Sequence, residues 1–307
     1  MPSSVRVRLS GPFDLALSLQ AAGSFLPGPG LDSSVVKLAI PIEGQPAVVE
    51  VEQITMRPAV IRASSTVHIG LAQLRDLAGW LVSGDLDLRP FYCIAAPHSI
   101  MGVVTKRLRG LKPLRPASLF EMGVIAITEQ QLSLAAAFHI RTRLINRFGT
   151  PVDGLRIFPA PESIAHASVS DLTTCGLSRR KAEYVQGFAP RIADDRLSFA
   201  ALKCKSNAEV REQLMSCKGS GDWSIQYILA RGLGRPDCLP SQDVGLRRVV
   251  GTYLARGRYL SPKQLEKALL PFVPFRGLAA FYLAVDARLY ASPHGVRVPI
   301  QELRSCA

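Results

Sequence analysis

Hydrophobic and polar positions follow one rhythm before about residue 95 and another rhythm after it. Residues 5–9 alternate apolar and polar side chains with a period of two, and the β-branched stretches 35–40 and 47–54 are bounded by Gly and Pro. These patterns are typical of strands joined by turns. Residues 71–82 have the pattern of one helix. We therefore expect residues 1–95 to form an α+β domain with an antiparallel sheet.

From Ser118 onward the pattern is almost entirely helical. Ser118 and Glu121 have the spacing of a capping box, and we expect them to open one long helix that reaches about residue 148. Ser206 and Glu209 have the same spacing at the start of another helix. Further helices are expected to begin at residues 161, 179 and 262.

The helical pattern predicts a region of two lobes, spanning residues 96–307, after the α+β domain. Residues 119–239 are expected to form one lobe, which contains a helical hairpin at 206–234. The second lobe is expected to combine residues 96–118 with residues 240–307. The fold class is therefore an α+β domain followed by an all-α region.

Composition limits the classes of protein that this chain can represent. Of its 307 residues 48% are hydrophobic, which excludes an intrinsically disordered protein. No apolar run reaches the roughly 18 residues that a membrane span needs, so we expect no membrane association. The six cysteines show no C-x-x-C spacing, so we expect no metal site and no cofactor. Scattered cysteines suit a cytoplasmic protein.

The chain carries a formal net charge of +13, and the excess lies in its second part. Residues 1–95 hold seven Lys and Arg and eight Asp and Glu, whereas residues 96–307 hold 30 and 16. Two stretches, 106–115 and 247–263, each hold five basic residues and no acid. Such a surplus attracts polyanions, of which nucleic acid is the commonest in a cell. A basic but otherwise ordinary enzyme is the alternative.

A glycine-rich turn lies between two amphipathic segments of the first lobe. Gly219, Ser220 and Gly221 follow one helix, and a second helix is expected to start near Asp222. The two glycines permit a tight turn, and the free N–H groups at the start of the second helix can bind a phosphate. A helix-hairpin-helix DNA-binding element and a plain helix connection fit these residues equally well.

Asp243 follows Trp223 by twenty residues and lies near another expected helix start. Pro240 and Ser241 are typical of such a start, which would place Asp243 in the first helical turn. An aspartate there stabilises the helix dipole, and this structural role is the simplest interpretation of the residue alone.

Taken together, these segments resemble the helix-hairpin-helix DNA glycosylases, and most closely the AlkA-type 3-methyladenine glycosylase II. The resemblance rests on the Gly-Ser-Gly turn, Trp223, the Arg-Gly-Leu-Gly run 231–234 and the Pro-x-x-Asp-x-Gly-Leu-Arg-Arg run 240–248. Residues 127–133 look like the Gln-Gln helix of that family. Residues 158–162, 176–184 and 274–282 also match in order and character. The likeness covers roughly residues 115–290.

The resemblance implies that Asp243 is the catalytic carboxylate of a glycosylase. Breaking the N-glycosidic bond of a damaged nucleotide produces an oxocarbenium-like sugar, and a fixed carboxylate can stabilise that charge and orient the attacking water. Bifunctional members of the superfamily carry a nucleophilic Lys after the hairpin glycines. This chain has Trp223 there, and Lys218 precedes the hairpin. A monofunctional enzyme without a lyase step is therefore expected.

The resemblance also implies a base pocket. Trp223 and Tyr227 are four residues apart and share one helix face, so they can stack on an extruded base. Ala284 stands where some relatives place a Trp that lines the pocket. Phe281 or Tyr282 is expected to line the pocket in place of that Trp, although either could equally belong to the core.

DNA contacts are expected from three places. Gln131 is expected near the wedge that fills the gap left by the extruded nucleotide, with Gln130 beside it. The hairpin contributes Lys218, Gly219, Ser220 and Gly221, and the segment after Asp243 contributes Arg247 and Arg248. Ser220 replaces an apolar residue that is usual in the family.

The sequence therefore predicts a monofunctional DNA glycosylase that excises alkylated purines of the 3-methyladenine type. One alternative keeps the fold and Asp243 but acts on oxidised or deaminated purines, such as 8-oxoguanine or hypoxanthine. Another is a DNA-binding protein without catalysis, in which Asp243 only caps a helix. The expected partner is double-stranded DNA that contains a damaged base, and the chain is expected to act as a monomer. Such an enzyme would be cytoplasmic and, in a prokaryote, associated with the nucleoid.

Overall fold

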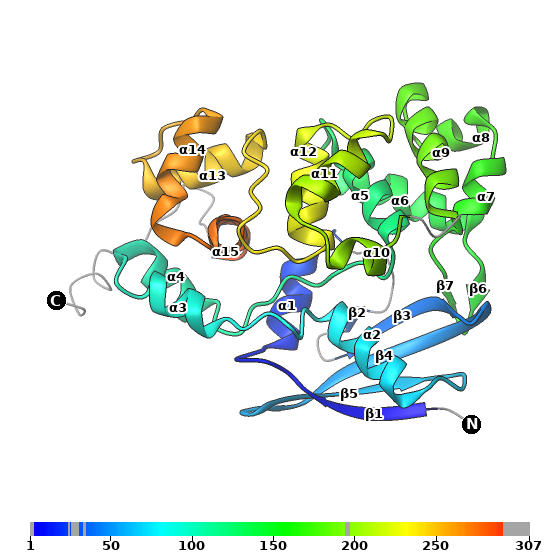
Figure 1. The fold of residues 1–307 in the computed structure, drawn as a ribbon, viewed down its shortest axis with the longest axis horizontal. Coiled ribbons are helices and arrows are strands. Elements are labelled where there is room, and N and C mark those ends of the chain that lie inside the picture. The colour runs from blue at the N-terminus through cyan, green and yellow to red at the C-terminus, as the bar shows by residue number, and fades with distance from the viewer. Residues whose placement is uncertain (1–2, 24, 26–30, 33–34, 194–196, 291–307) are drawn as a thin grey trace.

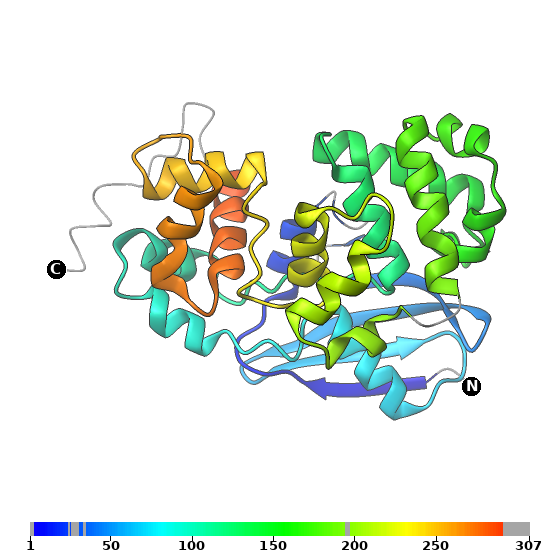
Figure 2. The same cartoon turned by 45° about the horizontal axis from the view of Figure 1, so that its top comes forward.

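The computed structural model describes residues 3–23, 25, 31–32, 35–193 and 197–290 of the chain. Figure 1 shows a sheet at one side of the molecule and two groups of helices above it. The first helix, α1 (Leu15–Ala22), lies between the sheet and both groups, and Figure 2 shows the same arrangement from a second direction. The α+β start and the helical region that follows confirm the predicted fold class.

The sheet is antiparallel and has five strands in the order β1-β5-β4-β3-β2. The strands are β1 (Ser3–Arg8), β2 (Leu31–Asp32), β3 (Val35–Ile42), β4 (Gln45–Met56) and β5 (Ala59–Ser65). Because side chains alternate between the two faces of a strand, Val49 and Val51 of β4 and Ile61 and Ala63 of β5 all point inward and are fully buried. Helix α2 (Leu71–Leu81) packs beside β1.

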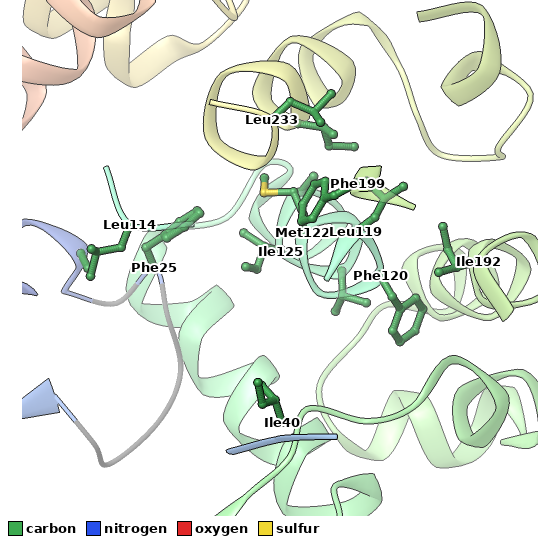
Figure 3. Close-up of a cluster of buried hydrophobic side chains, with 14 of the residues drawn as sticks. Phe25, Ile40, Leu114, Leu119, Phe120, Met122, Ile125, Ile192, Phe199 and Leu233 are labelled. Atoms are coloured by element: carbon green, nitrogen blue, oxygen red, sulfur yellow. The ribbon is translucent and has the colours of Figure 1, made fainter. Parts of the chain in front are cut away.

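The first helical lobe shares one hydrophobic core with the sheet. This lobe contains α5 (Leu119–Glu129), α6 (Leu134–Phe148), α7 (Pro161–His166), α8 (Val169–Thr174), α9 (Arg179–Ala193), α10 (Phe199–Lys203), α11 (Asn207–Met215), α12 (Asp222–Tyr227) and the π-helical turn η1 (Ile228–Gly232). A two-stranded ribbon of β6 (Pro151–Val152) and β7 (Leu155–Arg156) lies against β3 and β4. Figure 3 shows part of the core, with Phe25 and Ile40 drawn together with Met122 and Ile125 of α5.

The second lobe has a separate core. It is built from α3 (Arg89–Ala95), α4 (Ser99–Arg107), α13 (Val244–Leu254), α14 (Pro262–Leu269), the 3-10 turn η2 (Leu270–Phe272) and α15 (Arg276–Tyr290). Helix α3 falls before the boundary predicted at residue 95, yet Phe91 and Ala95 pack within this lobe. In the described part of the chain no single helix is long and apolar enough to span a membrane, and only α14–η2 with α15, bent by 102°, passes as a pair.

The prediction of one long helix from residue 118 to residue 148 is wrong. Helix α5 ends at Glu129, and Gln131 adopts a positive φ of 54°. Ser133 then caps α6, because its side chain accepts a hydrogen bond from Ala136 N. The Ser118 side chain caps α5, but the Glu121 carboxylate accepts from Ala117 N instead of completing a capping box.

The capping box at Ser206 and Glu209, in contrast, is present and begins α11.

The charge of the basic stretch 106–115 predicts a nucleic-acid surface, but two of its five cations are buried. Lys112 is fully buried, and its Nζ donates to the carbonyl of Ser10 at 2.7 Å. Arg115 is also buried, pairs with Asp85 and packs on the ring of Trp80. These two cations therefore hold the linker between the domains in place.

Candidate active site

A cavity of about 1450 Å³ lies between the two helical lobes. Its walls come from α1, the turn between α5 and α6, the Gly-Ser-Gly hairpin, α12 with η1, the start of α13 and α15. The sequence-predicted residues that line it are Gln130, Gln131, Lys218, Gly219, Ser220, Gly221, Trp223, Tyr227, Asp243 and Phe281. Tyr282, Arg247 and Arg248 do not line it.

Asp243 is held at the cavity wall by two hydrogen bonds. It is the N-cap of α13, so it lies just before that helix instead of in its first turn as predicted, and Oδ1 accepts from Leu246 N at 2.8 Å. Oδ2 accepts from the indole Nε1 of Trp223 at 2.9 Å. A carboxylate oxygen has more than one acceptor position, so both oxygens keep a lone pair for a ligand. The group is therefore a helix cap and a fixed anion at the same time.

Trp223 and Tyr227 form an aromatic wall. Their ring centroids are 5.0 Å apart and the rings are inclined by 25°, so the two are stacked. Both project from α12, which carries them on one face because they are four residues apart. A planar ligand entering the cavity therefore meets a preformed aromatic surface.

Phe281 and Tyr282, which were predicted together for the pocket, have different surroundings. Phe281 lines the cavity, as does Ala284 one turn later on α15. Tyr282 is fully buried in the second core, where its hydroxyl donates to the carbonyl of Leu111 at 2.8 Å. Adjacent helix residues point about 100° apart, and here that step turns Tyr282 away from the cavity and into the second core. Tyr282 is therefore a core residue, and its prediction as a pocket residue is wrong.

The hairpin is tied to the turn between α5 and α6. Gly219 has a φ of 88°, and a Cβ there would come within 2.5 Å of the Tyr184 ring, so the turn requires glycine. Gln130 Nε2 donates to the carbonyl of Gly219 at 2.9 Å and to Oγ of Ser224 at 2.8 Å. The amide donor that was predicted to contact DNA is therefore used to fix the hairpin.

The remaining predicted DNA contacts differ in exposure. Gln131, Lys218 and Gly221 are exposed at the cavity mouth, whereas Ser220 is buried. Arg248 is exposed on α13. The Arg247 side chain, in contrast, donates through Nε to the carbonyl of Leu260 at 2.6 Å and stacks on the Tyr259 ring.

Several cavity residues were not identified from the sequence. Glu129 is buried at the end of α5, and its Oε2 accepts from the hydroxyl of Tyr227 at 2.8 Å. Arg231 lines the cavity four residues after Tyr227, and Phe25 lines it from the segment after α1. The i, i+4 spacing of Tyr227 and Arg231 was a usable signal, since it places both on one helix face.

Burial shifts the pKa values of Glu129 and Arg231 in opposite directions. Burial raises the pKa of Glu129, while the nearby charge of Arg141 opposes that shift. Burial lowers the pKa of Arg231, and Tyr227 and Glu129 oppose that change. Across the residues that the structure describes, no three metal-ligating side chains come together in a way that could hold a metal ion.

Comparison with known proteins agrees with this geometry. A protein-family model described as "HhH-GPD superfamily base excision DNA repair protein" matches residues 124–274. The Bacillus subtilis protein YfjP is 31% identical over 170 residues, which are 54% of this chain and only 58% of that protein. An alkylbase DNA glycosidase-like protein of Schizosaccharomyces pombe is 31% identical over 163 residues, 52% of this chain and 75% of that protein. The solved 3-methyladenine DNA-glycosylase from Archaeoglobus fulgidus is 26% identical and superimposes with a TM-score of 0.80 over 94% of this chain and 100% of that one.

Proposed function

The chain belongs to the HhH-GPD superfamily of base excision DNA repair proteins, and we propose that it is a monofunctional DNA glycosylase for alkylated purines of the 3-methyladenine type. It extrudes the damaged nucleotide from duplex DNA into the cavity between the lobes. It then hydrolyses the N-glycosidic bond and leaves an abasic site. Its expected location, beside the nucleoid of a prokaryote, stays a prediction.

The observation that carries this proposal is the fixed carboxylate of Asp243 at the cavity wall. Two hydrogen bonds, from Leu246 N and Trp223 Nε1, orient it before any substrate arrives. Cleavage of the glycosidic bond places positive charge on the sugar, and an anion already in position stabilises that charge without reorganisation. The same oxygens can orient or deprotonate the water that attacks the anomeric carbon.

The aromatic wall supplies the base-binding surface. An extruded purine can stack against the Trp223 and Tyr227 pair, which projects from the helix that starts at the hairpin. An alkylated purine leaves readily because alkylation weakens its bond to the sugar. A general acid is therefore not required, and the proposal assigns the chemistry to Asp243 alone, next to the aromatic rings.

The absence of a lyase step rests on the position that Trp223 occupies. An indole cannot attack the sugar, whereas a lysine amine there could form a Schiff base. Lys218 does line the cavity, so the proposal requires a direct test. Borohydride reduction during turnover is expected to trap no protein–DNA adduct in high yield. Lys218→Ala is expected to weaken DNA binding but to leave the single-turnover rate of base release at saturating enzyme unchanged. An adduct that disappears in Lys218→Ala would contradict monofunctional action.

Because Asp243 also caps α13, a role as a helix cap alone is the competing interpretation. Asp243→Asn is expected to reduce base release by about hundredfold or more while DNA affinity is retained. Asp14→Asn is the matched control, since Asp14 caps α1 through Leu17 N at 2.9 Å and does not line the cavity. Equal base release by wild type and Asp243→Asn would establish the cap as the whole role.

Substrate choice is tested with a panel of duplexes that each carry one defined lesion, followed by alkaline cleavage of abasic sites. Release of alkylated purines is expected. Release confined to 8-oxoguanine or hypoxanthine would establish the alternative activity on oxidised or deaminated purines.

A further inference from the structure

Residues 176–184, one of the segments that resemble the glycosylase family, have no role in the function proposed above. They lead into the first turns of α9, where Lys181 and Tyr184 line the cavity between the lobes. The two residues are three positions apart and therefore share one helix face. The Tyr184 ring packs so closely on Gly219 of the hairpin that no Cβ would fit between them. This face of α9 therefore meets the hairpin directly.

The Lys181 side chain holds the end of α5 from the same face. Its Nζ donates to the carbonyl of Thr128 at 2.9 Å and to the carbonyl of Gln130 at 2.6 Å. Carbonyl groups in the last turn of a helix have no partner within the helix, and they form the negative end of its dipole. The half-buried ammonium of Lys181 bonds two of them, so it caps α5 from another helix.

The bond to the carbonyl of Gln130 fixes the peptide that immediately precedes Gln131. Gln131 has a φ of 54°, in the left-handed region that is unfavourable for residues other than glycine. Such a conformation persists only where the surrounding contacts hold it. The Gln131 side chain is exposed at the cavity mouth, so its direction depends on this backbone geometry. Lys181 therefore controls how Gln131 is presented to a ligand.

We propose that Lys181 is a positioning residue for nucleotide extrusion, which holds the turn between α5 and α6 in the conformation that directs Gln131 into the duplex. Its bonds are to the protein backbone and not to the damaged base, so it acts on every lesion alike. Because Tyr184 packs on the hairpin from the same face, α9 keeps the hairpin and this turn at a fixed spacing. This inference rests on the proposed glycosylase function and adds a residue to the same site.

The test is a double-mutant cycle between Lys181→Met and Gln131→Ala. Lys181→Met keeps the apolar stem and removes the ammonium. At saturating enzyme it is expected to slow single-turnover base release about tenfold, because two charge-assisted hydrogen bonds are lost. It should also reduce the fluorescence rise of a 2-aminopurine placed next to the lesion, which reports unstacking. In the Gln131→Ala background it should slow release less than about twofold, since the side chain that Lys181 positions is already absent.

Arg179→Met is the matched control, since Arg179 is exposed in the same helix turn and does not line the cavity. It should leave the release rate and the fluorescence unchanged. Slowing by Lys181→Met that is equally large with and without Gln131 would show that Lys181 does not act through that side chain, and it would overturn the inference.

Direct contact of Lys181 with a phosphate is the competing interpretation. Lys181→Met would then reduce the slope of log affinity against log salt by about one, with release at saturating enzyme and fluorescence unchanged, and this result would also overturn the inference. If Lys181→Met does not fold, Lys181→Gln takes its place with the same deciding outcomes, because its neutral amide keeps a polar tip but is one bond shorter. Failure of the wild-type chain to release any base would instead contradict the proposed function.

Discussion

The indole Nε1 of Trp223 donates a hydrogen bond of 2.9 Å to Oδ2 of Asp243. This bond joins the two helical lobes across the cavity, because Trp223 belongs to α12 and Asp243 caps α13. The other oxygen of the same carboxylate is held by Leu246 N. The orientation of the anion therefore depends on both lobes, and a change in either one alters the site.

Removal of the indole donor should misorient the carboxylate while the aromatic wall remains. Trp223→Phe is expected to slow base release by about tenfold or more, because a hydrogen bond to a charged group contributes about 1.5–3 kcal/mol. Affinity for abasic-analogue DNA should change little. Trp80→Phe is the matched control, since Trp80 Nε1 donates to the carbonyl of Pro116 outside the cavity. Single-turnover rates that are equal for the two variants would show that the bond does not orient Asp243.

The basic residues that follow Asp243 should account for part of the salt dependence of DNA binding. Arg248 is exposed on α13, close to the cavity. Each phosphate contact releases counterions, so Arg248→Ala should reduce the slope of log affinity against log salt by about one. Arg75→Ala, at an exposed position on α2 beside the sheet, should leave the slope unchanged. Equal slopes for all three proteins would remove Arg248 from the DNA interface.

The sequence was most informative where local rules decide the outcome. Alternation and β-branched runs identified β1, β3 and β4 but not β2 or β5. The paired Ser206 and Glu209 marked the start of α11. These signals depend only on nearby residues. The ordered motifs around Trp223 and Asp243 likewise fall on the same cavity. Helix phase alone, however, could not assign Phe281 to the cavity and Tyr282 to the core, since both lie on one apolar helix and only its neighbours distinguish them.

Tertiary contacts explain what the sequence did not predict. No Gly or Pro marks the break after Glu129, and there Gln130 bonds the hairpin, which lies almost ninety residues further along the chain. The charges of Lys112 and Arg115 gave no sign of burial, because their partners Ser10 and Asp85 are distant in sequence. Long-range partners of this kind cannot be read from local spacing.

Glu121 should make stability depend on pH. Burial raises the pKa of this carboxyl from 4.5 to about 7. Between those values the folded chain keeps a proton that the unfolded chain has lost, so stability falls as pH rises through that window. Glu121→Gln cannot titrate and keeps an acceptor for Ala117 N. The free energy of unfolding of Glu121→Gln, relative to that of wild type, should therefore rise by about 3 kcal/mol between pH 4.5 and pH 7. Urea unfolding curves at both pH values test this, and a constant difference would contradict it.

The adjacent glutamines of the turn should have separable roles. Gln130 fixes the hairpin through Gly219 and Ser224, so Gln130→Ala should lower the free energy of unfolding by about 1–3 kcal/mol. It should also weaken binding to damaged and undamaged duplexes alike. Gln131 is exposed at the cavity mouth. Gln131→Ala should therefore preserve stability and binding to undamaged DNA.

If Gln131 fills the gap left by the extruded nucleotide, its loss should slow base release and reduce the fluorescence rise of a 2-aminopurine placed next to the lesion, because that signal reports unstacking. The two variants serve as controls for each other, since they differ by one position in the same turn. Unchanged stability in Gln130→Ala would mean that its two hydrogen bonds do not hold the hairpin. Wild-type base release and fluorescence in Gln131→Ala would remove that side chain from nucleotide extrusion.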